Sequence, residues 1–169
     1  VKVHVWLAQA AFRETRFQDA RSHYGEALEI SRRRLDAVAE AEIHHGLGLV
    51  AQALGAFDQA EESLVAALHA HRRRGDLARE ADTLSCLGSL SAASGDLVKA
   101  EGCLRRALAI HMALGDGNGE TRVLGLLAMV LQEGGCLVEA REAHRACLER
   151  ARRLEARQSE VVALLNLAT

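Results

Sequence analysis

The stretch LSCLGSLSAASGDLVKAEGCLRRALAIHMALGD, residues 84–116, contains two apolar patterns of helical period with a turn signal between them. Leu84, Leu87 and Leu90 recur at the spacing that places side chains on one face of a helix. A second face follows, made of Leu97, Ala100, Leu104, Ala107, Leu108 and Leu114. Gly95-Asp96 predicts a helix stop followed by a helix cap, and Gly115-Asp116 ends the second pattern. The stretch therefore predicts two helices joined by a short turn.

The same register returns when the chain is written in rows of forty residues. The seventh residue of each row is Leu7, Leu47, Leu87, Leu127 and Leu167. The eighth is Ala8, Gly48, Gly88, Ala128 and Ala168, and the twentieth is Ala20, Ala60, Ala100 and Ala140. We predict repeats over residues 1–40, 41–80, 81–120 and 121–160, with an incomplete fifth over 161–169. A helix pair cannot bury both its faces alone, so we expect one all-α array over 1–169 in which antiparallel helix pairs stack.

Composition supports helices and narrows the classes of function. The 169 residues are 49% hydrophobic and 3% aromatic, with no proline, which excludes a typical β-sandwich. A net charge of −2 argues against nucleic acid as a partner. We expect no membrane span and no export signal, and four cysteines without CxxC spacing suit reduced thiols in a cytoplasmic protein.

The repeat resembles the tetratricopeptide repeat (TPR) family. It matches that consensus at positions 7, 8, 20 and 27, and departs from it at positions 4 and 11 and at the absent proline 32. The usual repeat has 34 residues, so we expect the six extra residues in a linker such as Leu114–Glu120. This longer form resembles kinesin light chains, cell-polarity adaptors and bacterial signalling regulators. The resemblance implies a right-handed superhelical solenoid.

The resemblance also implies a concave groove lined by the first helix of each pair. The groove positions are Lys2, Val5, Gln9, Phe12 and Arg13 in the first repeat and Glu42, His45, Leu49, Gln52 and Ala53 in the second. They are Asp82, Ser85, Ser89, Ala92 and Ala93 in the third, and Arg122, Gly125, Met129, Gln132 and Glu133 in the fourth. Such a groove suits an extended peptide or an amphipathic helix. It lacks the Lys/Asn set with which chaperone-binding members hold a C-terminal carboxylate.

No set of residues predicts catalysis, a cofactor or a metal. No two of the eight histidines have the i,i+3 or i,i+4 spacing that would let one helix present both to a metal. There is no phosphate-binding loop and no G-x-S-x-G motif, and we interpret Asp116–Glu120 as a turn and not as a calcium loop. We therefore expect a non-enzymatic protein.

Arginines recur at the predicted ends of the second helices. They are Arg32–Arg34, Arg72–Arg74 and Arg152–Arg153. Cations there complement the helix dipole, and the alternative is a basic ridge that binds an acidic peptide or a phosphate backbone.

The strongly apolar end, residues 161–169, predicts self-association through Val161, Leu164 and Leu165. We also expect the chain to be a fragment of a longer protein. Together these features predict a scaffold that binds a protein or peptide, as a regulatory module of a larger bacterial signalling or transcription protein. The alternatives are a self-assembly module and a small-ligand sensor.

Overall fold

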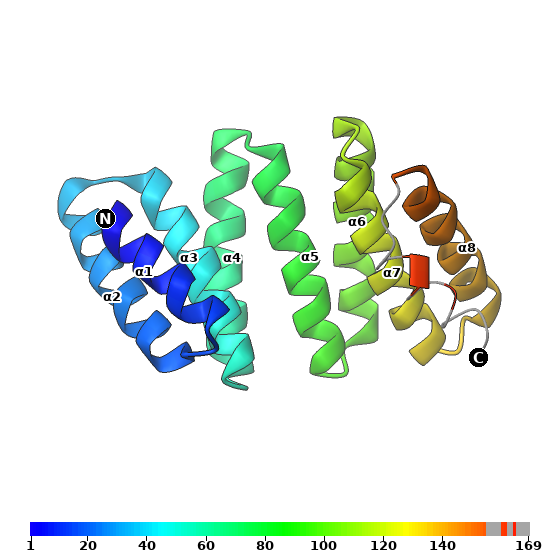
Figure 1. Cartoon of the computed structure of the whole chain (residues 1–169), viewed down its shortest axis with the longest axis horizontal. Coiled ribbons are helices and arrows are strands. Elements are labelled where there is room, and N and C mark those ends of the chain that lie inside the picture. The colour runs from blue at the N-terminus through cyan, green and yellow to red at the C-terminus, as the bar shows by residue number, and fades with distance from the viewer. Residues whose placement is uncertain (155–159, 162–163, 165–169) are drawn as a thin grey trace. The chain divides into compact units, whose positions relative to one another are not determined.

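The computed structural model describes residues 1–154, 160–161 and 164. Within them the chain forms eight α-helices and no β-strand, which confirms the all-α repeat fold (Figure 1). The helices are α1 (Lys2–Arg13), α2 (Phe17–Arg34), α3 (Ala37–Ala53), α4 (Phe57–Arg74), α5 (Leu77–Ala93), α6 (Leu97–Leu114), α7 (Gly117–Glu133) and α8 (Leu137–Arg153). None of these helices is long and apolar enough to cross a bilayer.

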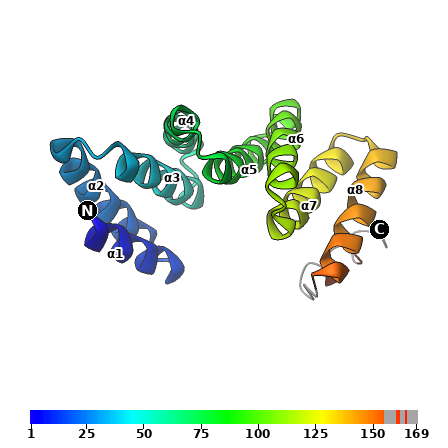
Figure 2. The ribbon, with the colours of Figure 1, turned by 90° about the horizontal axis from the view of Figure 1, so that it is seen from above.

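The helices belong to two compact units, Val1–Arg79 and Glu80–Thr169. In the first unit α1 packs against α2, α2 against α3 and α3 against α4, and α1 also touches α3 (Figures 1 and 2). In the second unit α7 packs against both α6 and α8. The boundary between the units falls in the first turn of α5, one residue before the end of the second predicted repeat.

Small residues let the paired helices approach closely. A Cβ atom added to Gly48 of α3 would lie 2.5 Å from Leu64 Cγ of α4, and one added to Gly88 of α5 would lie 2.6 Å from Leu104 Cγ of α6. The alanines at the twentieth row position are buried in every repeat. The small positions of the repeat therefore act sterically, where one helix crosses the next.

Short turns end the helices at the predicted glycines. Gly95 and Gly115 have φ values of +84° and +67°, the left-handed region that an L side chain rarely adopts. Asp96 then caps α6 by accepting a hydrogen bond from the Lys99 amide at 3.0 Å. The predicted turns at these pairs are confirmed.

The predicted Leu114–Glu120 linker is wrong in extent. Helix α6 continues to Leu114 and α7 begins at Gly117, so Gly115 and Asp116 alone separate them. The Asp116 carboxylate accepts a hydrogen bond from the Gly119 amide at 3.0 Å and so starts α7 directly after the turn. The additional residues of this repeat therefore lengthen its helices, which have 17 or 18 residues from α3 to α7.

Candidate functional site

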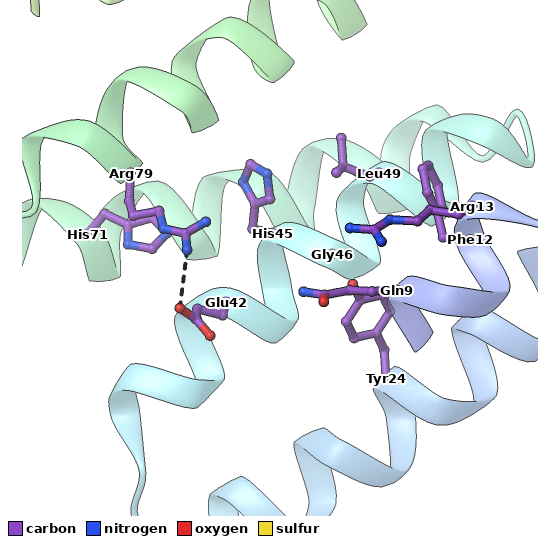
Figure 3. Close-up of a pocket in the computed structure, with 10 residues that line it drawn as sticks. All are labelled: Gln9, Phe12, Arg13, Tyr24, Glu42, His45, Gly46, Leu49, His71 and Arg79. Carbon is purple, nitrogen blue, oxygen red and sulfur yellow. Dashed lines mark hydrogen bonds and ion pairs between the residues drawn. The ribbon is translucent and has the colours of Figure 1, made fainter. Parts of the chain in front are cut away.

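A cavity of about 260 Å³ opens between α1 and α3 in the first unit (Figure 3). Three residues of α1 line it, together with residues of α2, α3 and α4 and the start of α5. These residues are Gln9, Phe12, Arg13, Tyr24, Glu42, His45, Gly46, Leu49, His71 and Arg79. In Figure 3 the side chains of Gln9 and Arg13 project from α1 toward α3.

A second cavity of about 340 Å³ lies beside the first and shares Gln9 and Glu42 with it. Its other lining residues are Val1, Lys2, Val5, Trp6, Asp36, Val38 and Ala39. We call the two cavities together the first-unit groove. All five groove positions named for the first repeat line it, as do Glu42, His45 and Leu49 of the second. The groove positions that the family resemblance implies for the first repeat thus line a hollow surface in the first unit.

The contact between Tyr24 and Gly46 shapes the floor of the groove. A Cβ atom added to Gly46 would lie 2.2 Å from Tyr24 Cζ, so only glycine lets the tyrosine ring pack this close to α3. Burial, with a smaller contribution from Glu42, raises the pKa of the Tyr24 hydroxyl. Tyr24 therefore offers the groove a neutral hydroxyl and a flat apolar ring.

The walls of the groove carry three cationic side chains, Lys2, Arg13 and Arg79, and two carboxylates, Asp36 and Glu42. Arg79 and Glu42 form an ion pair at 3.5 Å between α5 and α3, drawn as the dashed line in Figure 3. Within the described part of the chain, Lys2 and Arg13 form no ion pair. Burial lowers the pKa of His71, so this histidine is neutral at neutral pH. The groove therefore presents two cations without an ion pair: Arg13 lines the same cavity as Phe12 and Leu49, and Lys2 lines the adjoining cavity.

The groove positions expected in the second unit lie in different surroundings. Asp82 and Arg122 form an ion pair at 2.6 Å between α5 and α7. Ser85 is buried, and its hydroxyl donates to the Ala81 carbonyl at 2.8 Å, so it has no surface to offer a partner. Met129 is 55% exposed.

The remaining expected residues take intermediate positions. Gln132 is exposed, whereas Gln52 and Ser89 are half-buried. None of these three lines the first-unit groove.

Sequence reasoning missed Tyr24, Gly46, His71 and Arg79 of the first cavity, and Val1, Trp6, Asp36, Val38 and Ala39 of the second. Gly46 carries a readable signal, because the other rows have Trp6, Cys86 and Leu126 at the same position. A glycine there predicts close approach by a neighbouring side chain.

Two other surfaces were predicted outside the groove, the arginine clusters and the apolar end of the sequence. The arginine clusters occupy the last turns of α2, α4 and α8, as helix-dipole complementarity predicts. Of the self-association residues, Val161 is 55% and Leu164 is 43% exposed, and Leu165 lies outside the described residues.

Comparisons with known proteins agree with this architecture. The family model of the tetratricopeptide repeat matches residues 2–73. No curated protein matches the sequence.

Three solved structures have similar folds. The crystal structure of BtubC (BKLC) from P. vanneervenii is 27% identical, with a TM-score of 0.81 over 93% of this chain. A STAND protein with a tetratricopeptide repeat sensor from Pyrococcus horikoshii is 18% identical, with a TM-score of 0.87 over 96% of the chain. Putative kinesin light chain TPR-like repeats from Podosopora anserina are 18% identical, with a TM-score of 0.83 over 99% of the chain and 83% of that structure. The chain spans 63% of BtubC and 25% of the STAND protein.

Proposed function

We propose that the first-unit groove binds a segment of a partner protein, because residues 2–73 match the tetratricopeptide repeat family. TPR repeats generally mediate protein–protein interaction, and the family is typically non-enzymatic. The observation that carries the proposal is the pair of adjoining cavities that all five first-repeat groove positions line. An extended peptide or one face of a helix fits such a groove.

The chemistry of the groove defines the segment. Lys2 and Arg13 favour an acidic side chain, and Phe12 and Leu49 favour an apolar side chain next to it. We therefore propose a short segment in which an acidic residue lies beside an apolar anchor.

We further propose that the chain is a regulatory module of a larger bacterial signalling or transcription protein in the cytoplasm. The similarity to a STAND protein described as having a tetratricopeptide repeat sensor supports this role. A small effector is the alternative occupant of the groove, and binding of a metabolite in place of any peptide would favour it.

A second proposal is self-association through the segment that holds Val161 and Leu164. Both side chains are exposed although both are apolar, and exposed apolar patches favour association.

Peptide selection followed by affinity measurement tests the groove. A displayed random-peptide library is selected on the purified chain, and the Kd of an enriched peptide is measured by fluorescence anisotropy. Leu49→Lys should weaken binding at least tenfold, an effect of about 1.4 kcal/mol, because it places a charge against the apolar anchor.

Met129→Lys is the matched control, since Met129 occupies the same row position in the fourth repeat. It should leave the Kd within about twofold, the precision of such measurements. Equal losses from both substitutions, or a loss from Met129→Lys alone, would remove the site from the first unit. Circular dichroism establishes that both variants are folded.

A further inference from the structure

Two histidines and a glutamate meet where α1 and α2 pack together, away from the cavities described above. His4 Nδ1 on α1 lies 2.7 Å from Glu26 Oε2 on α2, and His23 Nδ1, also on α2, lies 4.0 Å from the same oxygen. The three ligand atoms all lie within 4.8 Å of one another. We propose that His4, His23 and Glu26 form a binding site for a divalent transition-metal ion, and that Zn²⁺ is a suitable occupant.

The helical hairpin brings these residues together. His23 and Glu26 are three residues apart and so share one face of α2. His4 and Glu26 lie equally far along the chain from Thr15 in the turn between the helices. Because the two helices run antiparallel, residues equidistant from the turn face each other.

The state of the two imidazole nitrogens points to a ligand. Nδ1 of His4 and Nδ1 of His23 are shielded from solvent, and neither has a hydrogen-bond partner of acceptable geometry among the described residues. His4 Nδ1 approaches the carboxylate closely but without the alignment of a hydrogen bond. A cation between the three atoms would accept the lone pairs of both nitrogens and neutralise the carboxylate. It would thereby supply the partner that these shielded nitrogens otherwise lack.

The distances suit zinc after small side-chain movements. Zn²⁺ lies about 2.1 Å from nitrogen and oxygen ligands, which separates two ligands of a tetrahedral site by about 3.4 Å. The observed 2.7 and 4.0 Å separations lie on either side of this value. The histidine side chains are each 32% exposed and Glu26 is 54% exposed, so an ion can reach the site and water can occupy a fourth position.

The donor set also selects among metals. Imidazole and carboxylate ligands suit Zn²⁺, Cu²⁺ or Ni²⁺, whereas Ca²⁺ and Mg²⁺ prefer oxygen ligands throughout. Other repeats do not need this arrangement for folding. The second repeat keeps His44 but has Ser63 and Ala66 at the other two positions, and the third and fourth have leucine in place of His4.

Metal titration of the chain, freed of metal by a chelator and carrying no histidine tag, tests the site. We expect saturable binding of about one Zn²⁺ per chain in competition with a chromophoric chelator, and no binding of Mg²⁺ at the same concentration. Glu26→Gln keeps the side-chain shape and should weaken Zn²⁺ binding at least tenfold, and His23→Ala should do the same. His69→Ala, an exposed histidine of α4, is the matched control and should leave the affinity unchanged.

Cobalt substitution and a folding measurement complete the test. Co²⁺ should give the visible spectrum of nitrogen and oxygen ligands, and the imidazole signals of His4 and His23 should shift in NMR spectra of the Zn²⁺-bound chain. A thiolate-to-cobalt charge-transfer band would place the ion on a cysteine and overturn the proposal. Equal weakening by His69→Ala, or the absence of saturable binding in a folded wild-type chain, would also overturn it.

Discussion

Two buried histidines of the second unit differ in the partners that their ring nitrogens have. His111 of α6 is buried, and its Nδ1 lies 2.9 Å from the Asp116 carboxylate that caps α7. His144 of α8 is also buried. The ring nitrogens of both histidines lack a hydrogen-bond partner of acceptable geometry among the described residues, and His144, unlike His111, forms no ion pair there. An unsatisfied buried polar group costs about 1–3 kcal/mol, so His144 is a destabilising residue of the second unit.

Replacing His144 should raise the free energy of unfolding and reduce its dependence on pH. Burial lowers the pKa of His144, so the unfolded chain binds a proton more readily than the folded chain just below the usual pKa of 6.5. Its contribution to stability is therefore constant above that value and falls as pH drops toward the lowered pKa. His144→Phe should stabilise the chain by about 1 kcal/mol at neutral pH, and by more at mildly acidic pH.

Urea unfolding across this pH range measures the effect. His44 and His71 also have lowered pKa values, so part of the pH dependence should remain in the variant. His69→Ala, at an exposed position, should leave the pH profile unchanged. The explanation fails if His144→Phe keeps the full wild-type slope.

At the scale of elements, each turn from α1 to α8 contains one residue with a left-handed backbone conformation. Five are glycines, but the first repeat uses Thr15 at φ +59° and Leu35 at φ +53°. Leu35 is 88% exposed, so its side chain gains little from packing there. The Ser31 hydroxyl donates to the Asp36 carbonyl at 2.8 Å and helps to hold this turn. Leu35 thus adopts a conformation that glycine adopts more easily.

Exchanging residues between equivalent turns should change stability in opposite directions. Leu35→Gly should raise the free energy of unfolding by about 0.5–1 kcal/mol, because the backbone strain of leucine exceeds the entropic cost of glycine. Gly75 occupies the same row position in the second repeat with φ +67°, and Gly75→Leu should lower stability by about 1 kcal/mol. Thermal or urea unfolding of the two variants tests the pair, and destabilisation by Leu35→Gly would contradict the argument.

Elements were largely predictable because helical period and glycine stops are local signals. The first-repeat groove positions were implied by the resemblance to the TPR family, and they line a hollow surface. The extent of the Leu114–Glu120 linker was predicted incorrectly, since an aspartate cap can start a helix within a glycine-rich stretch. Ser85 could not be placed either, because whether a small polar residue is buried depends on the helices around it.

Juxtapositions between helices were the least predictable feature. A search for histidine pairs on a single helix finds no metal site, and His4 meets Glu26 only because α1 and α2 form an antiparallel hairpin. The spacing of residues within one helix carries no information about the neighbour across a turn. The equal distance of both residues from the turn is a signal that a search across helices would have detected.

At the scale of the whole molecule, two exposed apolar side chains bear on whether the chain acts as a single copy. Val161 and Leu164 are 55% and 43% exposed and lie at the end of the described residues, beyond α8. With a net charge of only −2, charge repulsion between chains is weak and opposes association little. We predict that the chain self-associates at tens of micromolar concentration through the segment that contains these two residues.

Light scattering coupled to size-exclusion chromatography decides this prediction. The wild-type mass should rise from one chain toward two as concentration increases, and Val161→Glu with Leu164→Glu should keep it at one. Val98→Glu replaces a valine of α6 that is 86% exposed and should leave the wild-type behaviour unchanged. A wild-type mass of one chain at tens of micromolar would contradict the prediction. Dissociation by Val98→Glu would instead place the interface on α6, and exposure of an apolar side chain would then not identify the associating segment.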